Sequence, residues 1–212
     1  MRIVCVLMAV ALAGCSSSDE AKKAEAPAKA APKAPEKTPD LFKAVFDTSK
    51  GEIVVEVHRD WAPNGVDHFY SLINTGFYDN AKFFRVTHSY VQFGIAADPQ
   101  TNGLWSTARI ADDPRKQSNV KGTLTYAHLG PGSRTTQLFF NAKDNKDLDK
   151  QGFAPIGKVI SGMDVVESLW GAYGDVPPRG QGPDTAKIEL QGNAYLDAKF
   201  PRLDSIKKIT VQ

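Results

Sequence analysis

The feature that most limits the fold is a series of short apolar runs, each separated from the next by a cluster of Gly, Pro, Asp or Asn. The first two runs, within residues 43–58, alternate as strands do on either side of Thr48-Ser49-Lys50-Gly51, which predicts a hairpin. Further strands are expected at 83–86, 90–95, 123–127, 137–141, 154–160 and 206–211. This spacing suits a closed antiparallel β architecture.

Helical periodicity is confined to a few places. Pro63 is tolerated in a first helical turn, and apolar residues recur at helical spacing from Val66 to Ile73 before Gly76 stops the run, so one amphipathic helix is expected there. A second helix is expected from Met163 to Leu169, and a further short one is suggested after Gly192-Asn193.

The N-terminus has the pattern of an export signal. Arg2 precedes the ten-residue apolar run 3–12, which is too short to be a permanent transmembrane helix. Leu12-Ala13-Gly14-Cys15 followed by three serines resembles the lipobox of bacterial lipoproteins, in which the cysteine is lipidated. The alternative is ordinary signal cleavage near Ala13 or Gly14, with Cys15 incidental. We favour a membrane anchor on Cys15.

Composition divides the rest of the chain. Residues 16–39 repeat Ala, Lys and Pro and contain no aromatic residue, which predicts a disordered tether. We expect a signal peptide at 1–14, the anchored cysteine and tether at 15–41, and one domain at 42–212.

Charge and cysteine content narrow the function of that domain. Residues 40–212 contain 20 basic and 20 acidic residues, so a nucleic-acid partner, which would require a basic surface, is not expected. Residues 16–212 contain no cysteine, which excludes a disulfide framework, a CxxC redox pair and a thiolate zinc site there.

Four segments carry a family resemblance. They are Phe83-Phe84-Arg85-Val86, Gln92-Phe93-Gly94, residues 130–141 (GPGSRTTQLFFN), and Leu148-Asp149 with residues 152–159 (GFAPIGKV); the stretch 162–166 (GMDVV) fits the next segment of the same pattern. In order and approximate spacing they resemble the cyclophilin-type peptidyl-prolyl isomerases, over a region from about Phe42 to the C-terminus. Each segment alone is a weak signal, but four together make coincidence improbable.

The resemblance implies a mainly β fold, a closed eight-stranded antiparallel barrel capped by two α-helices, with a prolyl peptide bound on one face. It implies that Arg85 is the catalytic arginine. The other positions that it assigns to substrate binding are Tyr90, Gln92, Ala127, His128, Gln137, Phe139, Leu148 and Phe153.

The residue types suit that chemistry. Rotation about an X–Pro bond meets a barrier of roughly 20 kcal/mol, yet no covalent bond changes, so no metal or cofactor is expected. The reaction needs an apolar pocket for the proline ring and a fixed donor that favours the twisted amide. Arg85 suits the second role because a guanidinium stays charged and presents a rigid array of donors. Without the flanking segments, Arg85 would be interpreted as a structural arginine at a strand end.

The sequence departs from the family pattern in the segment after Arg85. The family usually places the glutamine eight residues after the arginine, with a Pro-Gly pair between them, whereas Arg85 and Gln92 are seven apart. The pocket phenylalanine of the family then maps to Ser89 or Tyr90, and Tyr90 is preferred because it keeps an aromatic face. A further departure is Asp147, which stands where many members have a tryptophan that helps to bind cyclosporin.

Other candidate sites are better explained as ordinary structure. The run 147–152 resembles half of a calcium loop but has Lys158 where a glutamate is needed, and the four histidines lack metal-site spacing. Asp98, Asp112 and Asp113 are expected to be solvated loop acids.

The leading hypothesis is a monomeric, lipid-anchored peptidyl-prolyl cis–trans isomerase that acts on proline-containing proteins folding in the cell envelope. The anchor would hold it at the cell membrane or the outer membrane, facing the periplasm or the exterior. One alternative is a cyclophilin-like binding module or chaperone with incidental turnover. Another is a structural lipoprotein that uses the barrel as a spacer, which the presence of Arg85, Gln92 and Phe139 disfavours.

Overall fold

The computed structural model of the protein describes residues 37–212. The expected signal peptide, Cys15 and nearly all of the expected tether lie outside the described residues. The strands are β1 (Leu41–Thr48), β2 (Glu52–His58), β3 (Arg85–Val86), β4 (Tyr90–Phe93), β5 (Thr123–Tyr126), β6 (Leu138–Asn141), β7 (Pro155–Ser161) and β8 (Ile206–Val211). The helices are α1 (Pro63–Asn74), α2 (Pro99–Trp105), α3 (Met163–Ser168) and α4 (Thr185–Lys199), with a 3₁₀ helix, η1 (Lys146–Gln151).

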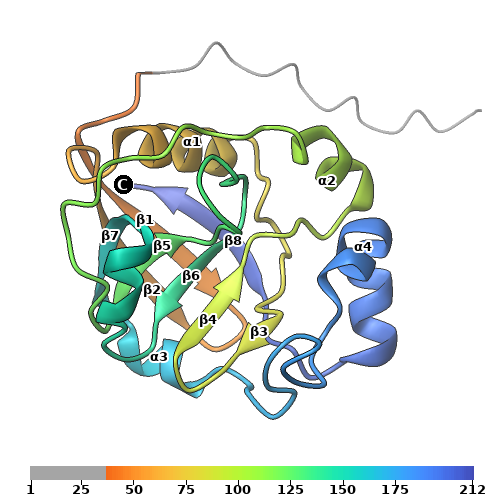
Figure 1. Cartoon of the computed structure of the whole chain (residues 1–212). Helices are drawn as coiled ribbons and strands as arrows, with labels where there is room; N and C mark the ends of the chain where they lie inside the picture. Colours follow the sequence, from red (N-terminus) through yellow and green to blue (C-terminus); the bar gives the residue numbers. More distant parts are fainter. Residues whose placement is uncertain (1–36) are drawn as a thin grey trace, which may run out of the picture. The chain divides into compact units, whose positions relative to one another are not determined.

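All eight expected strands are present, and they form one sheet in the order β3-β4-β6-β5-β7-β2-β1-β8. Every neighbouring pair is antiparallel. The sheet curls around a common interior, with α1 across its upper end and α3 below it in Figure 1. The mainly β, antiparallel fold expected from the sequence is confirmed.

The expectation that the barrel is closed is wrong, because the edge strands β3 and β8 are not paired with each other. Beside β8 runs the segment before β3, which makes one isolated bridge, between Lys82 and Ser205. Only Arg85–Val86 of the apolar run 83–86 pairs with β4, whereas Phe83 donates its N–H to the carbonyl of Asp204 at 3.0 Å. Consecutive side chains of the run alternate between two clusters, as in a strand. Phe83 packs in the main core, while Phe84 packs in a smaller cluster with Ile95, Ile188, Leu196 and Leu203.

Both expected helices are present, as α1 and α3, and the short helix suggested after Gly192-Asn193 lies within α4, while α2 was not expected. The helices α2 and α4 lie together outside the β3–β4 edge (Figure 1). Asp98 and Asp184 cap their N-termini by accepting backbone N–H groups. Within α4, Gly192 has a left-handed φ of 57°, and a Cβ there would collide with the carbonyl oxygen of Ala97. The glycine therefore allows α4 to pack closely against the chain entering α2.

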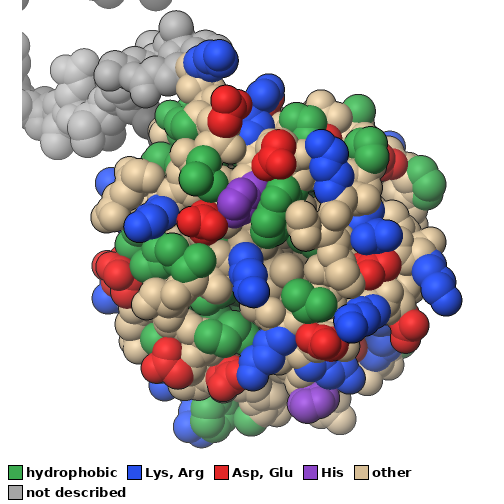
Figure 2. All heavy atoms as spheres, turned by 90° about the vertical axis from the view of Figure 1, so that its left-hand side faces the viewer, with side chains coloured by type: hydrophobic (Ala, Val, Ile, Leu, Met, Phe, Trp, Pro, Cys, Tyr) green, Lys and Arg blue, Asp and Glu red, His purple; other side chains and the backbone are tan. Residues whose placement is uncertain are grey.

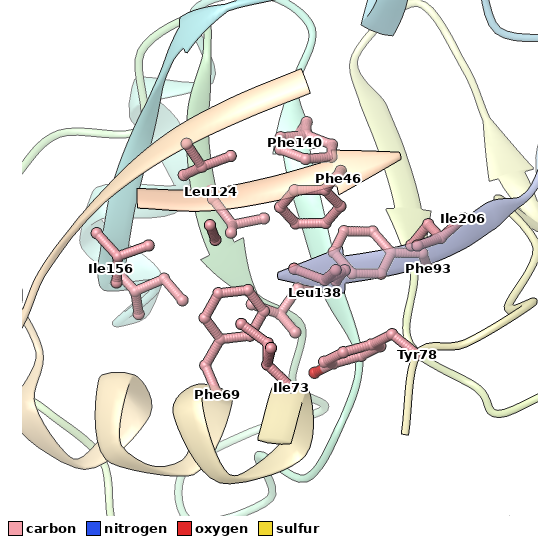
Figure 3. Packing of buried hydrophobic residues seen from close by; sticks show 14 of the residues in the cluster. Phe46, Phe69, Ile73, Tyr78, Phe93, Leu124, Leu138, Phe140, Ile156 and Ile206 are labelled. Carbon is pink, nitrogen blue, oxygen red and sulfur yellow. The ribbon is translucent and has the colours of Figure 1, made fainter. Parts of the chain in front are cut away.

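The interior is dense in aromatic side chains. Phe46 lies at its centre, with ring centroids 5.7 Å from Phe93, 5.5 Å from Phe140 and 6.4 Å from Phe69 of α1. Figure 3 shows these rings among Leu124, Leu138 and Ile156 from the neighbouring strands. The first two pairs are edge-to-face contacts, a geometry that adds stabilisation to the burial itself. This packed interior makes the sheet a rigid support for side chains on its other face.

The surface mixes charges of both signs. On the face shown in Figure 2, basic and acidic side chains are interspersed with apolar ones, and neither sign dominates an area. Among the helices of residues 37–212, none combines the length and apolar character needed to cross a membrane.

Candidate active site

A row of three polar side chains crosses the sheet at its β3 edge. Arg85 and Gln92 are partners in the β3–β4 ladder, so their side chains point to the same face. Arg85 Nη1 donates a hydrogen bond to Gln92 Oε1 at 3.0 Å, and Gln92 Nε2 donates to Gln137 Oε1 at 3.0 Å. Gln92 is only 8% exposed. The buried amide therefore connects the guanidinium to the start of β6.

Aromatic side chains lie directly beside this row. The ring of Tyr90 is 5.4 Å from that of Phe139, which is 5.9 Å from Phe153; both contacts are edge-on. The imidazole of His128 stacks on Phe153 with centroids 3.8 Å apart. Arg85 Cζ lies 5.1 Å from the Tyr90 ring centroid, within the range of a cation–π contact. Apolar walls and a cationic donor are thus brought together.

The short turn before β4 determines which residue supplies the aromatic ring. The hydroxyl of Thr87 accepts the backbone N–H groups of Ser89 and Tyr90 at 3.2 and 3.0 Å. The carbonyl of Ser89 accepts a hydrogen bond from Asn145 Nδ2 at 3.0 Å. The turn thus fixes Ser89 by its backbone, while the ring of Tyr90 faces that of Phe139.

A network of buried asparagine and threonine side chains links the strands next to the site. Asn145 Nδ2 donates to Asn141 Oδ1 at 2.8 Å, and Asn141 Nδ2 donates to the hydroxyl of Thr123 at 2.8 Å. Asn119 Oδ1 accepts from the hydroxyl of Thr125 at 2.9 Å. The network joins β5, β6 and the segment leading into η1. Sequence reasoning missed these asparagines, because nothing in their local sequence indicates that they are buried.

The η1 turn brings the backbone of Leu148 next to that of Phe153. The carbonyl of Leu148 accepts the N–H of Phe153 at 3.4 Å, and Gly152 adopts the left-handed conformation that ends the turn, with φ 83°. Asp149 ties the turn to Ser118 and Asn119. Burial alone would raise the pKa of Asp149, but the hydrogen bonds from these residues outweigh it and hold the pKa below its ordinary value.

The other two predicted positions follow β5. Ala127 donates its N–H to the carbonyl of Gln137 at 2.9 Å, extending the pairing of β5 with β6. His128 Nδ1 accepts the N–H of Gly130 at 3.2 Å. Burial lowers the pKa of His128, Asp112 opposes that shift, and Arg134 adds to it, so a neutral ring is favoured against Phe153. The nine residues predicted for the site are joined by these hydrogen bonds and ring contacts, with Leu148 linked through its carbonyl to the N–H of Phe153.

One of the acids expected to be solvated is buried instead. Asp113 accepts the backbone N–H groups of Asn64 and Gly65, each at 2.9 Å, at the start of α1. It also accepts from Arg134 Nη2 at 3.0 Å, and its side chain is 0% exposed. The start of a helix requires acceptors for its free N–H groups. The local sequence Asp112-Asp113-Pro114 did not indicate that Asp113 would serve as one. Asp147, by contrast, is exposed on η1.

Within residues 37–212, no group of three or more His, Cys, Asp or Glu side chains is arranged to hold a metal ion. The side chains that the structure brings together at this face are the guanidinium of Arg85, the amides of Gln92 and Gln137, and the aromatic rings of Tyr90, Phe139 and Phe153.

Comparison with known proteins identifies the family. The profile described as "Cyclophilin type peptidyl-prolyl cis-trans isomerase/CLD" matches residues 43–187, which include every site residue predicted above. The chain belongs to this family. Peptidyl-prolyl cis-trans isomerase B of Escherichia coli strain K12 is 31% identical over 135 residues, which cover 59% of this chain and 82% of that protein. The isomerase cyp18 of Streptomyces antibioticus is 31% identical over 161 residues, covering 68% and 96%.

A solved cyclophilin supports the architecture. The crystal structure of a Cryptosporidium parvum cyclophilin-type isomerase superimposes with a TM-score of 0.62 and 19% sequence identity, covering 81% of this chain and 98% of that one. At that identity the likeness shows the cyclophilin fold alone. Residues 188–212, which hold most of α4 and all of β8, lie beyond the family match.

Sequence reasoning missed one charged residue at this cyclophilin site. Asp175, in the segment between α3 and α4, lies with Oδ1 2.7 Å from Arg85 Nε, and its Oδ2 accepts from Arg85 Nη2 at 3.2 Å. The two residues are 90 positions apart in the sequence, and no local pattern around Asp175 indicated the contact.

Proposed function

We propose that this cyclophilin catalyses peptidyl-prolyl cis–trans isomerisation with Arg85 as its catalytic group. Membership of the family, together with relatives that are named as isomerases, supports the activity. The observation that carries the assignment to Arg85 is its position: a guanidinium held by Gln92 lies against the ring of Tyr90, which is in contact with Phe139.

The reaction requires that amide resonance be weakened, without making or breaking any other bond. In the twisted amide the prolyl nitrogen regains its lone pair, so a donor that interacts with this state more strongly than with the planar amide lowers the barrier. Arg85 Nη1 and Nη2 each use one hydrogen on Gln92 or Asp175. Each nitrogen carries a second hydrogen, which can be directed at the substrate.

The aromatic side chains supply the second requirement, a surface against which the proline ring is held. Phe139 is 4% exposed and is flanked by Tyr90 and Phe153. A rate gain of about 10⁵ needs roughly 7 kcal/mol of differential binding. One charge-assisted bond in a dry pocket, together with fixed positioning, accounts for a sum of that order.

The test of this proposal is a protease-coupled isomerisation assay on short X–Pro peptides. We expect Arg85→Ala to reduce kcat/KM at least tenfold, equivalent to about 1.4 kcal/mol or more, with little change in Tm. Arg85→Lys should rescue poorly, because an ammonium lacks the planar donor array. The matched control is Arg109→Ala, which removes an exposed arginine. Full turnover in Arg85→Ala would refute the proposed role. Peptide binding by the wild type without turnover would favour the binding-module alternative.

We further propose that the enzyme works in the cell envelope, attached through lipid on Cys15 and separated from the membrane by the Ala/Pro/Lys-rich tether. The proposal is supported by the sequence of residues 1–39. Replacing Cys15 with serine should move the protein from the membrane fraction into a soluble or unprocessed form. Mature-sized Cys15→Ser protein that still sediments with membranes would show that the anchor is something else.

A further inference from the structure

The segment between α3 and α4 places a carboxylate against the guanidinium of Arg85. Asp175 meets the side of the guanidinium formed by Nε and Nη2, at 2.7 and 3.2 Å, while Gln92 occupies Nη1 at 3.0 Å. The side chains of Arg85 and Asp175 are 15% and 22% exposed. Because the pair is largely shielded from water, the contact is screened less than a surface ion pair.

The segment is folded around the backbone of Asp175. The carbonyl of Asp175 accepts the N–H of Gly182 at 2.8 Å, and Asp175 Oδ1 accepts the N–H of Val176 at 2.7 Å. A Cβ on Gly180 would collide with the carbonyl oxygen of Asp175, and one on Gly182 would lie 2.8 Å from it. Two glycines are thus needed for the chain to close on this residue, which fixes where its carboxylate points.

The geometry indicates that Asp175 orients the guanidinium of Arg85 and does not block its access to the substrate. The carboxylate accepts one hydrogen bond, from Nη2 at 3.2 Å, and its other oxygen lies 2.7 Å from Nε as an ion-pair contact. Contact with two nitrogens on one side restricts rotation of the guanidinium. It leaves one hydrogen on Nη1 and one on Nη2 at the opposite end, the end that Gln92 also touches. Without Asp175, Arg85 would be held by a single hydrogen bond from Nη1 and by the face of Tyr90, so the guanidinium could rotate about its last side-chain bonds.

We propose that Asp175 is a positioning residue that orients the guanidinium of Arg85 for isomerisation. The proposal rests on the function proposed above for Arg85. Asp175 acts through Arg85 and does not touch the substrate. Its contribution should therefore appear in the transition state, in which the donor direction matters most, and much less in the binding of the planar substrate.

The experiment compares Asp175→Ala, Asp175→Asn and Asp175→Glu with the wild type in the isomerisation assay. We expect Asp175→Ala to lower kcat/KM about tenfold, with KM within about twofold of wild type, because a small misplacement of a catalytic group is costly. Asp175→Asn keeps the shape but loses the charge and should fall nearly as far, whereas Asp175→Glu should recover part of the activity. The control is Asp184→Ala, which removes the α4 cap at the end of the same segment without touching Arg85.

A double-mutant cycle separates positioning from general loosening of the segment. In an Arg85→Ala background, Asp175→Ala should change kcat/KM by less than about twofold, because Asp175 acts through the guanidinium of Arg85, which is absent in that background. Gly180→Ala, which displaces the backbone of Asp175, should reproduce the loss in the wild-type background and have no effect in Arg85→Ala.

The outcomes distinguish this proposal from the one on which it rests. Full activity in Arg85→Ala would refute the proposed function itself. A large loss in Arg85→Ala with unchanged kcat/KM in Asp175→Ala would overturn only the positioning role. Higher kcat/KM in Asp175→Ala would also overturn it, since the carboxylate would then compete with substrate for Arg85. Equal losses for Asp184→Ala and Asp175→Ala would show that the segment acts only by its folding.

Discussion

Gln92 offers a sharp test of the site, because it connects Arg85 to the rest of the sheet. Gln92→Leu keeps the approximate size of a buried side chain but removes the acceptor for Arg85 Nη1 and the donor to Gln137, both at 3.0 Å. A hydrogen bond to a charged group contributes about 1.5–3 kcal/mol net. If the whole free energy of this hydrogen bond is lost from the transition state, kcat/KM should fall about 10- to 150-fold.

The effect on stability should be much smaller. Arg85 keeps its contact with Asp175, and Gln137 is only half-buried, so water can replace the lost partner of each. We expect the free energy of unfolding to fall by about 1 kcal/mol or less, which corresponds to a drop in Tm of roughly 2–4 °C for a domain of this size.

The assay measures kcat and KM separately on an X–Pro peptide, alongside Tm by thermal unfolding. Gln191→Leu is the matched control, because it makes the same chemical change at an exposed position on α4. The loss in Gln92→Leu should fall mainly on kcat. If its kcat/KM stays within about twofold of wild type while Arg85→Ala is nearly inactive, then Arg85 does not depend on the row of amides for its orientation.

Three further predictions concern other parts of the domain. Asp113→Ala should lower the free energy of unfolding by about 3–5 kcal/mol, because it leaves Arg134 buried without its closest carboxylate; a loss below about 1 kcal/mol in urea unfolding would show that water compensates the charge. Burial lowers the pKa of His68 and of His128, so the unfolded state takes up protons first and stability should decline as the pH falls below about 6.5. Urea unfolding at pH 7.5 and 5.5 measures that decline, which should be smaller in His68→Gln; an equal decline in the variant would contradict the assignment. Asp147→Trp should strengthen inhibition by cyclosporin at least tenfold, as expected for an added aromatic contact at an interface, and equal inhibition constants would mean that this position does not meet the inhibitor.

The strands were predictable because their evidence is local. Alternating apolar residues within 43–58 and the turn at Thr48–Gly51 specify one hairpin, and the structure forms it as β1 and β2 with a register from Leu41 opposite His58 to Asp47 opposite Glu52. Whether the barrel closes could not be predicted from neighbouring residues alone. It depended on how far the segment before β3 would pair with β8, more than 100 residues later, and that segment makes one isolated bridge, between Lys82 and Ser205.

The residues of the site also fall into those that the sequence predicted and those that it did not. The resemblance located Arg85, Gln92, Gln137 and the aromatic residues because each lies in a short, recognisable segment. The choice of Tyr90 over Ser89 followed from one physical consideration, the need for an aromatic face, and the turn built on Thr87 directs that ring toward Phe139. The buried asparagines were missed because an amide in a polar stretch has no sequence pattern that distinguishes a surface position from a buried one.

Asp175 was beyond prediction for a different reason, which bears on how the site works. Its surroundings contain the prolines and glycines of an ordinary surface loop, but its neighbours Tyr173 and Val176 pack against the small cluster around Phe84, to which α4 also contributes. The helix α4 is held in the same region by the close approach of Gly192 to Ala97, and Phe84 is the residue immediately before Arg85. The segment that carries the carboxylate and the strand that carries the guanidinium are therefore positioned by the same packed cluster, so a change in that cluster would displace both partners together. Mutations at Phe84 or Leu196 should consequently reduce isomerisation more than their effect on Tm alone would suggest.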